Sequence, residues 1–190
     1  MSKIDRPEMK SRTRQRSLTL LVTVGSTRFD ALIERIFSED VANLLTSLHF
    51  NRLIVQTGAS DYDKRKVESI RKNHQLQIEV YDYKNSLLDD IDRADVVMGH
   101  AGAGTCLEVL RKNKRLLLVV NDTLMDNHQN ELADQLSADK HVIASNIAEL
   151  LVNLEKICDV ETKLEEFPPN NSSKFEEIFN EALKNVTSRM

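Results

Sequence analysis

The sequence has few of the residues that mark disulfide scaffolds and small metal-bound domains. Its 190 residues include two cysteines, three prolines, five glycines and no tryptophan. Cys106 and Cys158 lie far apart and form no C-x-x-C pair, which excludes a disulfide scaffold and a zinc ribbon and fits a reducing compartment. No histidine, cysteine or carboxylate side chains follow metal-ligand spacing, so we expect no metal ion.

Long apolar runs and a strong positive charge are also missing. The longest unbroken apolar run is Leu116–Val120, far below the roughly 20 residues that a bilayer span needs. Residues 1–17 lack the apolar stretch of a signal peptide and hold six basic and two acidic residues. We therefore expect a cytoplasmic chain with a basic, disordered tail over residues 1–17; weak contact of this tail with anionic lipid or an acidic partner is the alternative. The net charge of −4 argues against nucleic acid as the main partner.

Short apolar runs alternate with amphipathic stretches along residues 18–158. The expected strands are Leu18–Val24, Leu53–Gln56, Gln77–Tyr81, Asp95–Met98, Leu116–Val120 and His141–Ala144. The expected helices are Phe29–Leu48 (one broken helix or two), Tyr62–Asn73, Ser86–Arg93, Thr105–Lys112, Asp126–Ser137 and Ile147–Cys158. Near-continuous apolar strands separated by helices are typical of parallel sheets. The pattern predicts the α/β class, with a Rossmann-like parallel sheet and helices on both faces.

Residues 159–190 read as a linker and a C-terminal amphipathic helix. The prolines of EEFPPNN interrupt the helical pattern, which resumes over Ser173–Ser188 with an apolar stripe. That stripe is a candidate docking element for a partner, or it packs back onto the chain's own domain.

Three of the five glycines lie between Gly99 and Gly104, after an expected strand and before an expected helix. Ligands of parallel sheets bind at this end of the strands, and the free N–H groups of a helix start favour phosphate. Thr105 stands where a P-loop needs lysine, and Leu107 stands where the dinucleotide fingerprint needs its third glycine. ATP or GTP hydrolysis and NAD binding are therefore disfavoured, and a diphosphate-binding loop is the first hypothesis.

Each polar side chain near this loop has two interpretations. Glu108 either forms a capping box with Thr105 or accepts hydrogen bonds from a ribose diol. The Gly25–Thr27 segment is either a turn and helix N-cap or a source of donors to the same crevice. His100 is either structural or a donor to a phosphate oxygen.

A second polar cluster follows the fifth expected strand, in NDTLMDNHQNELA over residues 121–133. Carboxylates and amides of this kind recognise sugar hydroxyls, whereas an ordinary polar loop with Asp126 as helix N-cap is the simpler interpretation. Because both clusters follow adjacent expected strands, together they favour a nucleotide-sugar site.

Three stretches carry a family resemblance: VTVGSTRFDALI, GHAGAGTCLEVLRKNKRLLLVVNDTLMDNHQNELADQL and LEEFPPNNSSKFEEIF. They resemble the cytosolic, donor-binding subunits of the UDP-N-acetylglucosamine (UDP-GlcNAc) transferase that adds the second sugar to dolichol-linked oligosaccharide. This family is similar in turn to the carboxyl-terminal half of GT-B glycosyltransferases. The resemblance covers roughly Leu18–Phe179 and leaves residues 1–17 out.

The resemblance implies a diphosphate site built largely from main-chain groups. Its expected members are Gly25, Ser26, Thr27, Gly102, Ala103 and Gly104. Thr105, at the expected start of the following helix, is added to the binding residues from its position. The donor substrate is UDP-GlcNAc, and no further cofactor is implied.

The resemblance also assigns roles to side chains. Glu108 would hold the ribose hydroxyls, and Asp126, Asn127 and Gln129 would orient the N-acetylglucosamine hydroxyls. From its position in the glycine loop rather than from the resemblance, His100 is the expected catalytic residue, which would stabilise charge on the departing UDP.

The implied activity is that of a hexosyltransferase that works only with a second subunit. GlcNAc would pass from UDP-GlcNAc to GlcNAc-diphosphodolichol, the second step of lipid-linked oligosaccharide assembly for N-glycosylation. A membrane-anchored, acceptor-binding partner would hold the chain at the cytosolic face of the endoplasmic reticulum. Two alternatives stay open: a non-enzymatic nucleotide-sugar-binding regulatory module, and a small UDP-sugar hydrolase or epimerase.

Overall fold

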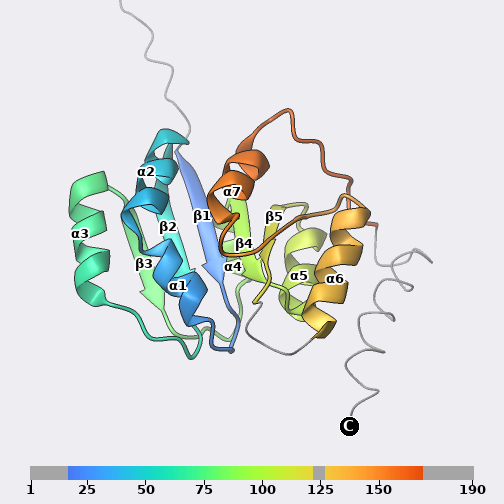
Figure 1. Ribbon diagram of the computed structural model, residues 1–190, viewed down its shortest axis with the longest axis horizontal. Helices are drawn as coiled ribbons and strands as arrows, with labels where there is room; N and C mark the ends of the chain where they lie inside the picture. The colour runs from blue at the N-terminus through green and yellow to red at the C-terminus, as the bar shows by residue number, and fades with distance from the viewer. Residues whose placement is uncertain (1–16, 122–126, 169–190) are drawn as a thin grey trace, which may run out of the picture.

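The structure is a computed structural model that describes residues 17–121 and 127–168. These residues form a six-stranded parallel sheet of order β3-β2-β1-β4-β5-β6 (Figure 1). The strands are β1 (Leu18–Thr23), β2 (Phe50–Gln56), β3 (Gln77–Tyr81), β4 (Val96–His100), β5 (Arg115–Val119) and β6 (Ile143–Ser145). The helices are α1 (Asp30–Ile36), α2 (Glu39–Ser47), α3 (Lys64–His74), α4 (Leu88–Arg93), α5 (Ala103–Arg111), α6 (Asn127–Ala138) and α7 (Leu150–Cys158).

The central strands are apolar at successive positions because both faces of the sheet are buried. In β1, the side chains of Leu20 and Val22 pack into one core cluster and that of Leu21 packs into the other, all fully buried. Successive side chains of a strand point to opposite faces of the sheet. A continuous apolar run is therefore expected only where helices cover both faces. The predicted α/β, Rossmann-like class is confirmed.

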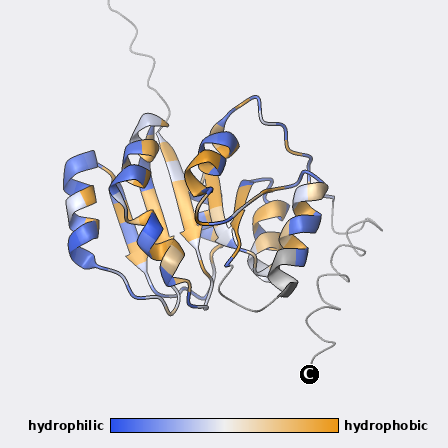
Figure 2. Ribbon diagram, viewed as in Figure 1, coloured by the Kyte–Doolittle hydropathy of each residue, from blue (hydrophilic) through white to orange (hydrophobic). Residues whose placement is uncertain are grey.

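Each face of the sheet is covered by its own helices. One core cluster contains residues of α1, α2, α3 and α7, and the other contains residues of α4, α5 and α6. The apolar colouring in Figure 2 concentrates in the strands and on the helix sides that face them. The outer sides of the helices are polar, as expected from the amphipathic pattern on which the helix predictions were based.

The order of the strands positions the site. The chain passes from β1 outward to β2 and β3, then returns to place β4 on the other side of β1. Ligands of such sheets bind at this switch point, beyond the carboxyl ends of the two neighbouring strands. The β1–α1 and β4–α5 connections meet there.

Several boundaries differ from the predicted ones. The stretch Phe29–Leu48 forms two helices, and the strand expected from Leu53 begins at Phe50. The strand expected to end at Met98 runs on to His100, because Gly99 pairs with both β1 and β5 and His100 pairs with β5. The helix expected from Thr105 begins two residues earlier, which changes the interpretation of the site below.

The first part of the linker is bound to the domain. Arg115 donates to the carbonyl oxygens of Ile157 (2.6 Å), Asp159 (3.1 Å) and Thr162 (2.9 Å). Phe167 is 8% exposed and packs in the second core cluster. Residues 1–16 and the helix predicted over residues 173–188 lie outside the described residues. Within the described ranges, every helix is too short or too polar to serve as a membrane span.

Candidate functional site

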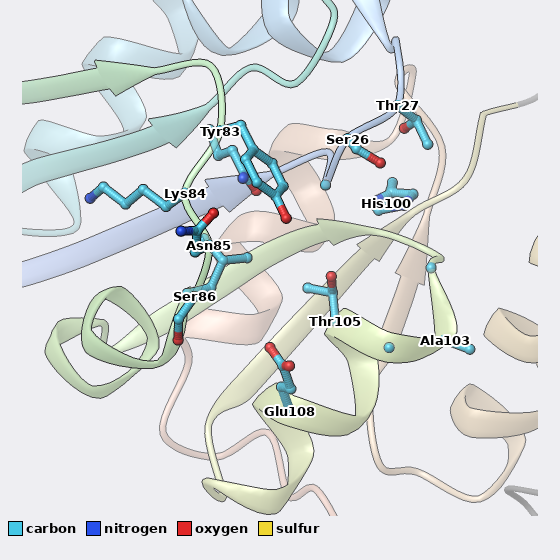
Figure 3. Close-up of a pocket in the computed structure, with 15 residues that line it drawn as sticks. Ser26, Thr27, Tyr83, Lys84, Asn85, Ser86, His100, Ala103, Thr105 and Glu108 are labelled. Atoms are coloured by element: carbon cyan, nitrogen blue, oxygen red, sulfur yellow. The ribbon is translucent and has the colours of Figure 1, made fainter.

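A pocket of about 330 Å³ opens at the switch point of the sheet (Figure 3). The connections that follow β1, β3 and β4 contribute to it, together with Gln56, the last residue of β2. Its lining consists of Gly25, Ser26, Thr27, Gln56, Tyr83, Lys84, Asn85, Ser86, Leu87, His100, Gly102, Ala103, Gly104, Thr105 and Glu108. Nine of these are residues that the sequence singled out, brought together from positions 25–27 and 100–108.

The start of α5 provides the main-chain donors of the pocket. Gly102 is the N-cap, and the first intrahelical bond runs from the Cys106 N–H to the Gly102 carbonyl at 3.0 Å. The N–H groups of Ala103, Gly104 and Thr105 therefore lack acceptors within the helix. Because no side chain caps this end, free N–H groups and the positive end of the helix dipole lie at the pocket, an arrangement that suits an anion.

The capping-box interpretation of Thr105 and Glu108 is wrong. A capping box needs its threonine at the N-cap, and this helix has Gly102 there, with Thr105 as its third residue. Both side chains instead lie along the side of α5 that lines the pocket (Figure 3). Glu108 is thus one turn beyond the free N–H groups, exposed, and available to accept hydrogen bonds from a ligand.

The N-cap interpretation of the first loop is also wrong. The N-cap of α1 is Phe29, and no side chain caps that helix. Thr27 instead donates through Oγ1 to the Val24 carbonyl at 2.7 Å, which closes the turn on itself. The loop is braced from outside, because a Cβ on Gly58 would lie only 2.3 Å from the Thr27 carbonyl oxygen. Gly58 also has φ +56°, a left-handed conformation that glycine adopts at low cost, so both the conformation and the lack of space favour glycine at this position.

His100 is held between the two glycine-containing loops. A Cβ on Gly25 would lie 2.9 Å from Cε1 of the imidazole, and a Cβ on Gly102 would lie 2.5 Å from Nε2. Gly102 has an ordinary φ of −82°, so its role is to make room for the ring. These two glycines are needed by the protein itself before any ligand is considered.

The imidazole of His100 is neutral at neutral pH. It is 7% exposed, and Nδ1 is buried without a hydrogen-bond partner among the described residues. Burial lowers the pKa of His100 below 6.5, and the backbone of Thr23 offsets only part of that effect. A neutral ring can donate one hydrogen bond to an anion without the cost of a buried cation.

Gly104 differs from the other two glycines of the loop. A Cβ at this position would meet no protein atom within 4 Å, and the residue lies in a regular helix. Nothing in the described structure therefore requires glycine at position 104, although glycine in a helix costs about 0.5–1 kcal/mol relative to alanine. A bound group approaching the main chain at this point would account for it.

Sequence reasoning missed one wall of the pocket. Gln56 is 1% exposed and accepts from Thr23 Oγ1 at 2.5 Å, beneath the first loop. The segment Tyr83–Leu87 follows β3 and lines the side opposite α5. Its residues form no recognisable motif, and the available signal was only their position after the third strand.

The predicted sugar-binding cluster remains a prediction. Asp126 lies outside the described residues, so its alternative role as N-cap of α6 is not described either. Asn127 and Gln129 lie in the first turn of α6, and their side chains also lie outside the described part.

The remaining chemistry of the described residues is limited. Cys106 is 1% exposed, and burial raises the pKa of its thiol to about 12, as expected for a small packed residue rather than a nucleophile. Within residues 17–121 and 127–168, no three histidine, cysteine or carboxylate side chains gather closely enough to hold a metal ion.

Comparison with known proteins gives a consistent result. The glycosyltransferase family 28 C-terminal domain matches residues 19–186. The mouse protein "UDP-N-acetylglucosamine transferase subunit ALG13" is 45% identical over 121 residues, which cover 64% of this chain and 10% of the mouse protein. The protein of the same name from Cryptococcus neoformans var. neoformans serotype D is 32% identical over 195 residues, covering 87% of this chain and 96% of the fungal protein. The chain thus spans about a tenth of the mouse relative and nearly all of the fungal one.

Solved structures agree with this result. The NMR solution structure of ALG13 superposes with a TM-score of 0.65 at 26% identity, covering 87% of this chain and 96% of that one. The crystal structure of Acinetobacter baumannii MurG superposes with a TM-score of 0.56 at 19% identity, covering 89% of this chain and 46% of that one. The likeness to MurG concerns the fold alone.

Proposed function

The chain belongs to the glycosyltransferase family 28 C-terminal domain family, and from that premise we propose that its pocket binds UDP-GlcNAc as the glycosyl donor. The fungal relative of nearly the same length is named as a UDP-N-acetylglucosamine transferase subunit. One observation carries the proposal: the free N–H groups of α5, the exposed carboxylate of Glu108 and the neutral ring of His100 line a single pocket.

Each part of the pocket suits one part of the donor. The diphosphate would lie at the start of α5, where the main-chain N–H groups of Ala103, Gly104 and Thr105 can donate to it. Glu108, one turn along the helix, would accept from the ribose hydroxyls. The opposite wall, Tyr83–Leu87, leaves the nucleobase a surface to lie on.

The first loop and the residues around α6 complete the proposed donor site. Gly25, Ser26 and Thr27 would face the diphosphate from the β1 side of the pocket. Asp126, Asn127 and Gln129 would orient the N-acetylglucosamine hydroxyls. We propose no cofactor and no metal ion beside the donor.

The chemistry would be inverting transfer. An acceptor hydroxyl attacks the anomeric carbon, the bond from that carbon to the diphosphate oxygen breaks, and UDP leaves with the electron pair. Negative charge then grows on the diphosphate, which the helix start and a hydrogen bond from His100 would stabilise. Because the ring is neutral, it would do so as a hydrogen-bond donor rather than as a cation.

The acceptor would be held by a second protein. The described residues form one Rossmann-like sheet, and the fungal relative of nearly the same length is named as a transferase subunit. We propose a heteromeric enzyme in which a membrane-anchored partner binds GlcNAc-diphosphodolichol and brings this cytoplasmic chain to the cytosolic face of the endoplasmic reticulum. The general base that takes the acceptor proton would then lie on the partner.

The test is transfer of labelled GlcNAc to a dolichol-type acceptor by three preparations: the purified chain, membranes containing the partner, and the two combined. We expect transfer only in the combined sample, and loss of it with His100→Ala or Glu108→Ala. Release of UDP by the purified chain without acceptor would instead identify a hydrolase or epimerase. UDP-GlcNAc binding without turnover in any mixture would identify a regulatory module. Failure of UDP-GlcNAc to bind would reject the site itself.

A further inference from the structure

We propose that Asp90 is a positioning residue for this site, acting through Lys84 to fix the pocket wall formed by Tyr83–Leu87 (the donor-site wall). Asp90 lies on α4, outside the pocket lining, whereas Lys84 belongs to the wall itself. The inference rests on the proposed function only for the identity of the nucleotide that the wall contacts.

Asp90 is a buried carboxylate with a complete set of partners. Its side chain is 2% exposed and accepts from Lys84 Nζ at 2.8 Å, from the Tyr81 hydroxyl at 2.5 Å and from the guanidinium of Arg93. Burying an ionised carboxylate costs several kcal/mol unless donors surround it. The three donors around Asp90 offset this cost and, together with the carboxylate, fix one another's positions.

The carboxylate stays ionised. Burial acts to raise the pKa of Asp90, but hydrogen bonds from Lys84, Tyr81 and Arg93 outweigh burial and lower it. Burial and the neighbouring Asp90 raise the pKa of the Tyr81 hydroxyl far above 10, so Tyr81 acts as a donor throughout. The pair of Asp90 and Lys84 is therefore charged on both sides at neutral pH.

Lys84 is held at three points. Its ammonium group contacts Asp90 at 2.8 Å and Glu79 at 3.0 Å, and lies 3.8 Å from the centroid of the Tyr81 ring. These contacts direct the side chain of a pocket-lining residue away from the pocket, as Figure 3 shows. An exposed lysine with one partner would gain little, but three converging contacts define one orientation.

The orientation of Lys84 sets that of its neighbour. The side chains of the consecutive residues Tyr83 and Lys84 point in different directions (Figure 3). With Lys84 directed outward, the ring of Tyr83 points into the pocket toward α5 (Figure 3), although Tyr83 is 63% exposed and has little packing of its own. The backbone before it is already tied to the sheet, because the Gly58 N–H donates to the Asp82 carbonyl at 3.0 Å. The anchored side chain of Lys84 then fixes the backbone that follows Tyr83.

Asp90→Asn tests the inference, because it removes the charge and keeps the shape of the side chain. We expect UDP to bind about tenfold more weakly, with the amides of Tyr83–Leu87 becoming more mobile in NMR relaxation measurements well below the melting temperature. Asp92→Asn is the matched control: it lies on the same helix, pairs with Lys112 at 2.9 Å and is outside the pocket lining. It should leave both readouts at wild-type values.

A second variant separates positioning from general destabilisation. Lys84→Met removes the tie from the partly exposed side and should weaken UDP binding as Asp90→Asn does, whereas Lys84→Arg should restore most of it. The double variant should bind about as weakly as either single variant, because both remove one interaction. Additive losses, or a lowered melting temperature with unchanged UDP affinity and unchanged wall mobility, would overturn the inference.

The same experiment distinguishes this inference from the proposed function. If the wild-type chain does not bind UDP, the proposed function fails, and the mobility of Tyr83–Leu87 alone then decides whether Asp90 holds the wall. If wild type binds UDP and Asp90→Asn binds it equally well, only the positioning role is rejected.

Discussion

Gly104→Ala should stabilise the unliganded protein and weaken nucleotide binding in the same variant. The new Cβ meets no protein atom within 4 Å, and the residue lies in the first turn of α5. Replacing a helical glycine by alanine is worth about 0.5–1 kcal/mol. For a chain of this size, that gain raises the melting temperature by about 1–4 °C.

The loss of binding follows from the same methyl group. It projects from the main chain beside the free N–H groups, where we place the diphosphate. A hydrogen bond to a charged group contributes about 1.5–3 kcal/mol, so loss of one such contact weakens UDP binding about tenfold or more. Calorimetric titration with UDP and a thermal melt of the unliganded chain measure the two effects separately.

Gly102→Ala is the control, because it should give the opposite result for stability. Its Cβ would lie 2.5 Å from Nε2 of His100, so the ring or the loop must move and the melting temperature falls. Unchanged UDP affinity in Gly104→Ala, with the expected rise in melting temperature, would refute the placement of the diphosphate. A fall in melting temperature would refute the steric argument from which the magnitude is derived.

Three further predictions follow from single contacts. Glu108→Ala should weaken UDP binding about tenfold and change stability by at most about 0.5 kcal/mol, because an exposed residue that caps no helix is lost; a larger fall in the melting temperature would contradict this. Because the folded-state pKa of His100 lies below 6.5, the unfolded chain takes up a proton first as the pH falls. Wild type should therefore lose stability between about pH 7 and pH 5, and His100→Asn should lose less in denaturant titrations over that range; equal slopes would oppose the reasoning. Arg115→Met should cost about 1–3 kcal/mol, because three carbonyl oxygens lose their donor, and should leave UDP affinity unchanged; altered affinity would indicate that the linker reaches the site.

The strands of the sheet were predictable from the sequence because burial on both faces requires apolar residues at successive positions. Short apolar runs such as LLLVV are typical of strands buried on both faces of a parallel sheet, and each expected strand is present. The errors lie where pairing overrides local preference. Gly99 and His100 are poor strand formers, yet they extend β4 because Gly99 pairs with both β1 and β5 and His100 pairs with β5. Asn51 and Arg52 likewise interrupt the apolar pattern of β2 without ending the strand.

The candidate site was predicted on one side only. A glycine-rich loop before a helix is typical of an anion-binding helix start, so this side of the pocket, at α5, could be predicted from the sequence. Tyr83, Lys84 and Asp90 carry no such pattern, because their arrangement depends on β3 and α4 meeting in space. The misassigned start of α5 had a similar cause: Thr105 resembles an N-cap by type, but Gly102 occupies that position because the ring of His100 needs the room beside it.

If the pocket binds a nucleotide as proposed, its position at the switch point would connect that nucleotide to strands on both sides of the sheet's centre. Its walls come from residues 25–27 and 83–87 on one side of the central pair of strands and from residues 100–108 on the other. A nucleotide that contacts the walls on both sides would hold together two parts of the sheet that are synthesised one after the other. A nascent chain that has not yet emerged as far as α5 would lack the helix start proposed to hold the diphosphate. In the finished protein, bound nucleotide should slow amide exchange in β2 and β5 alike, the strands on either side of the central pair β1 and β4.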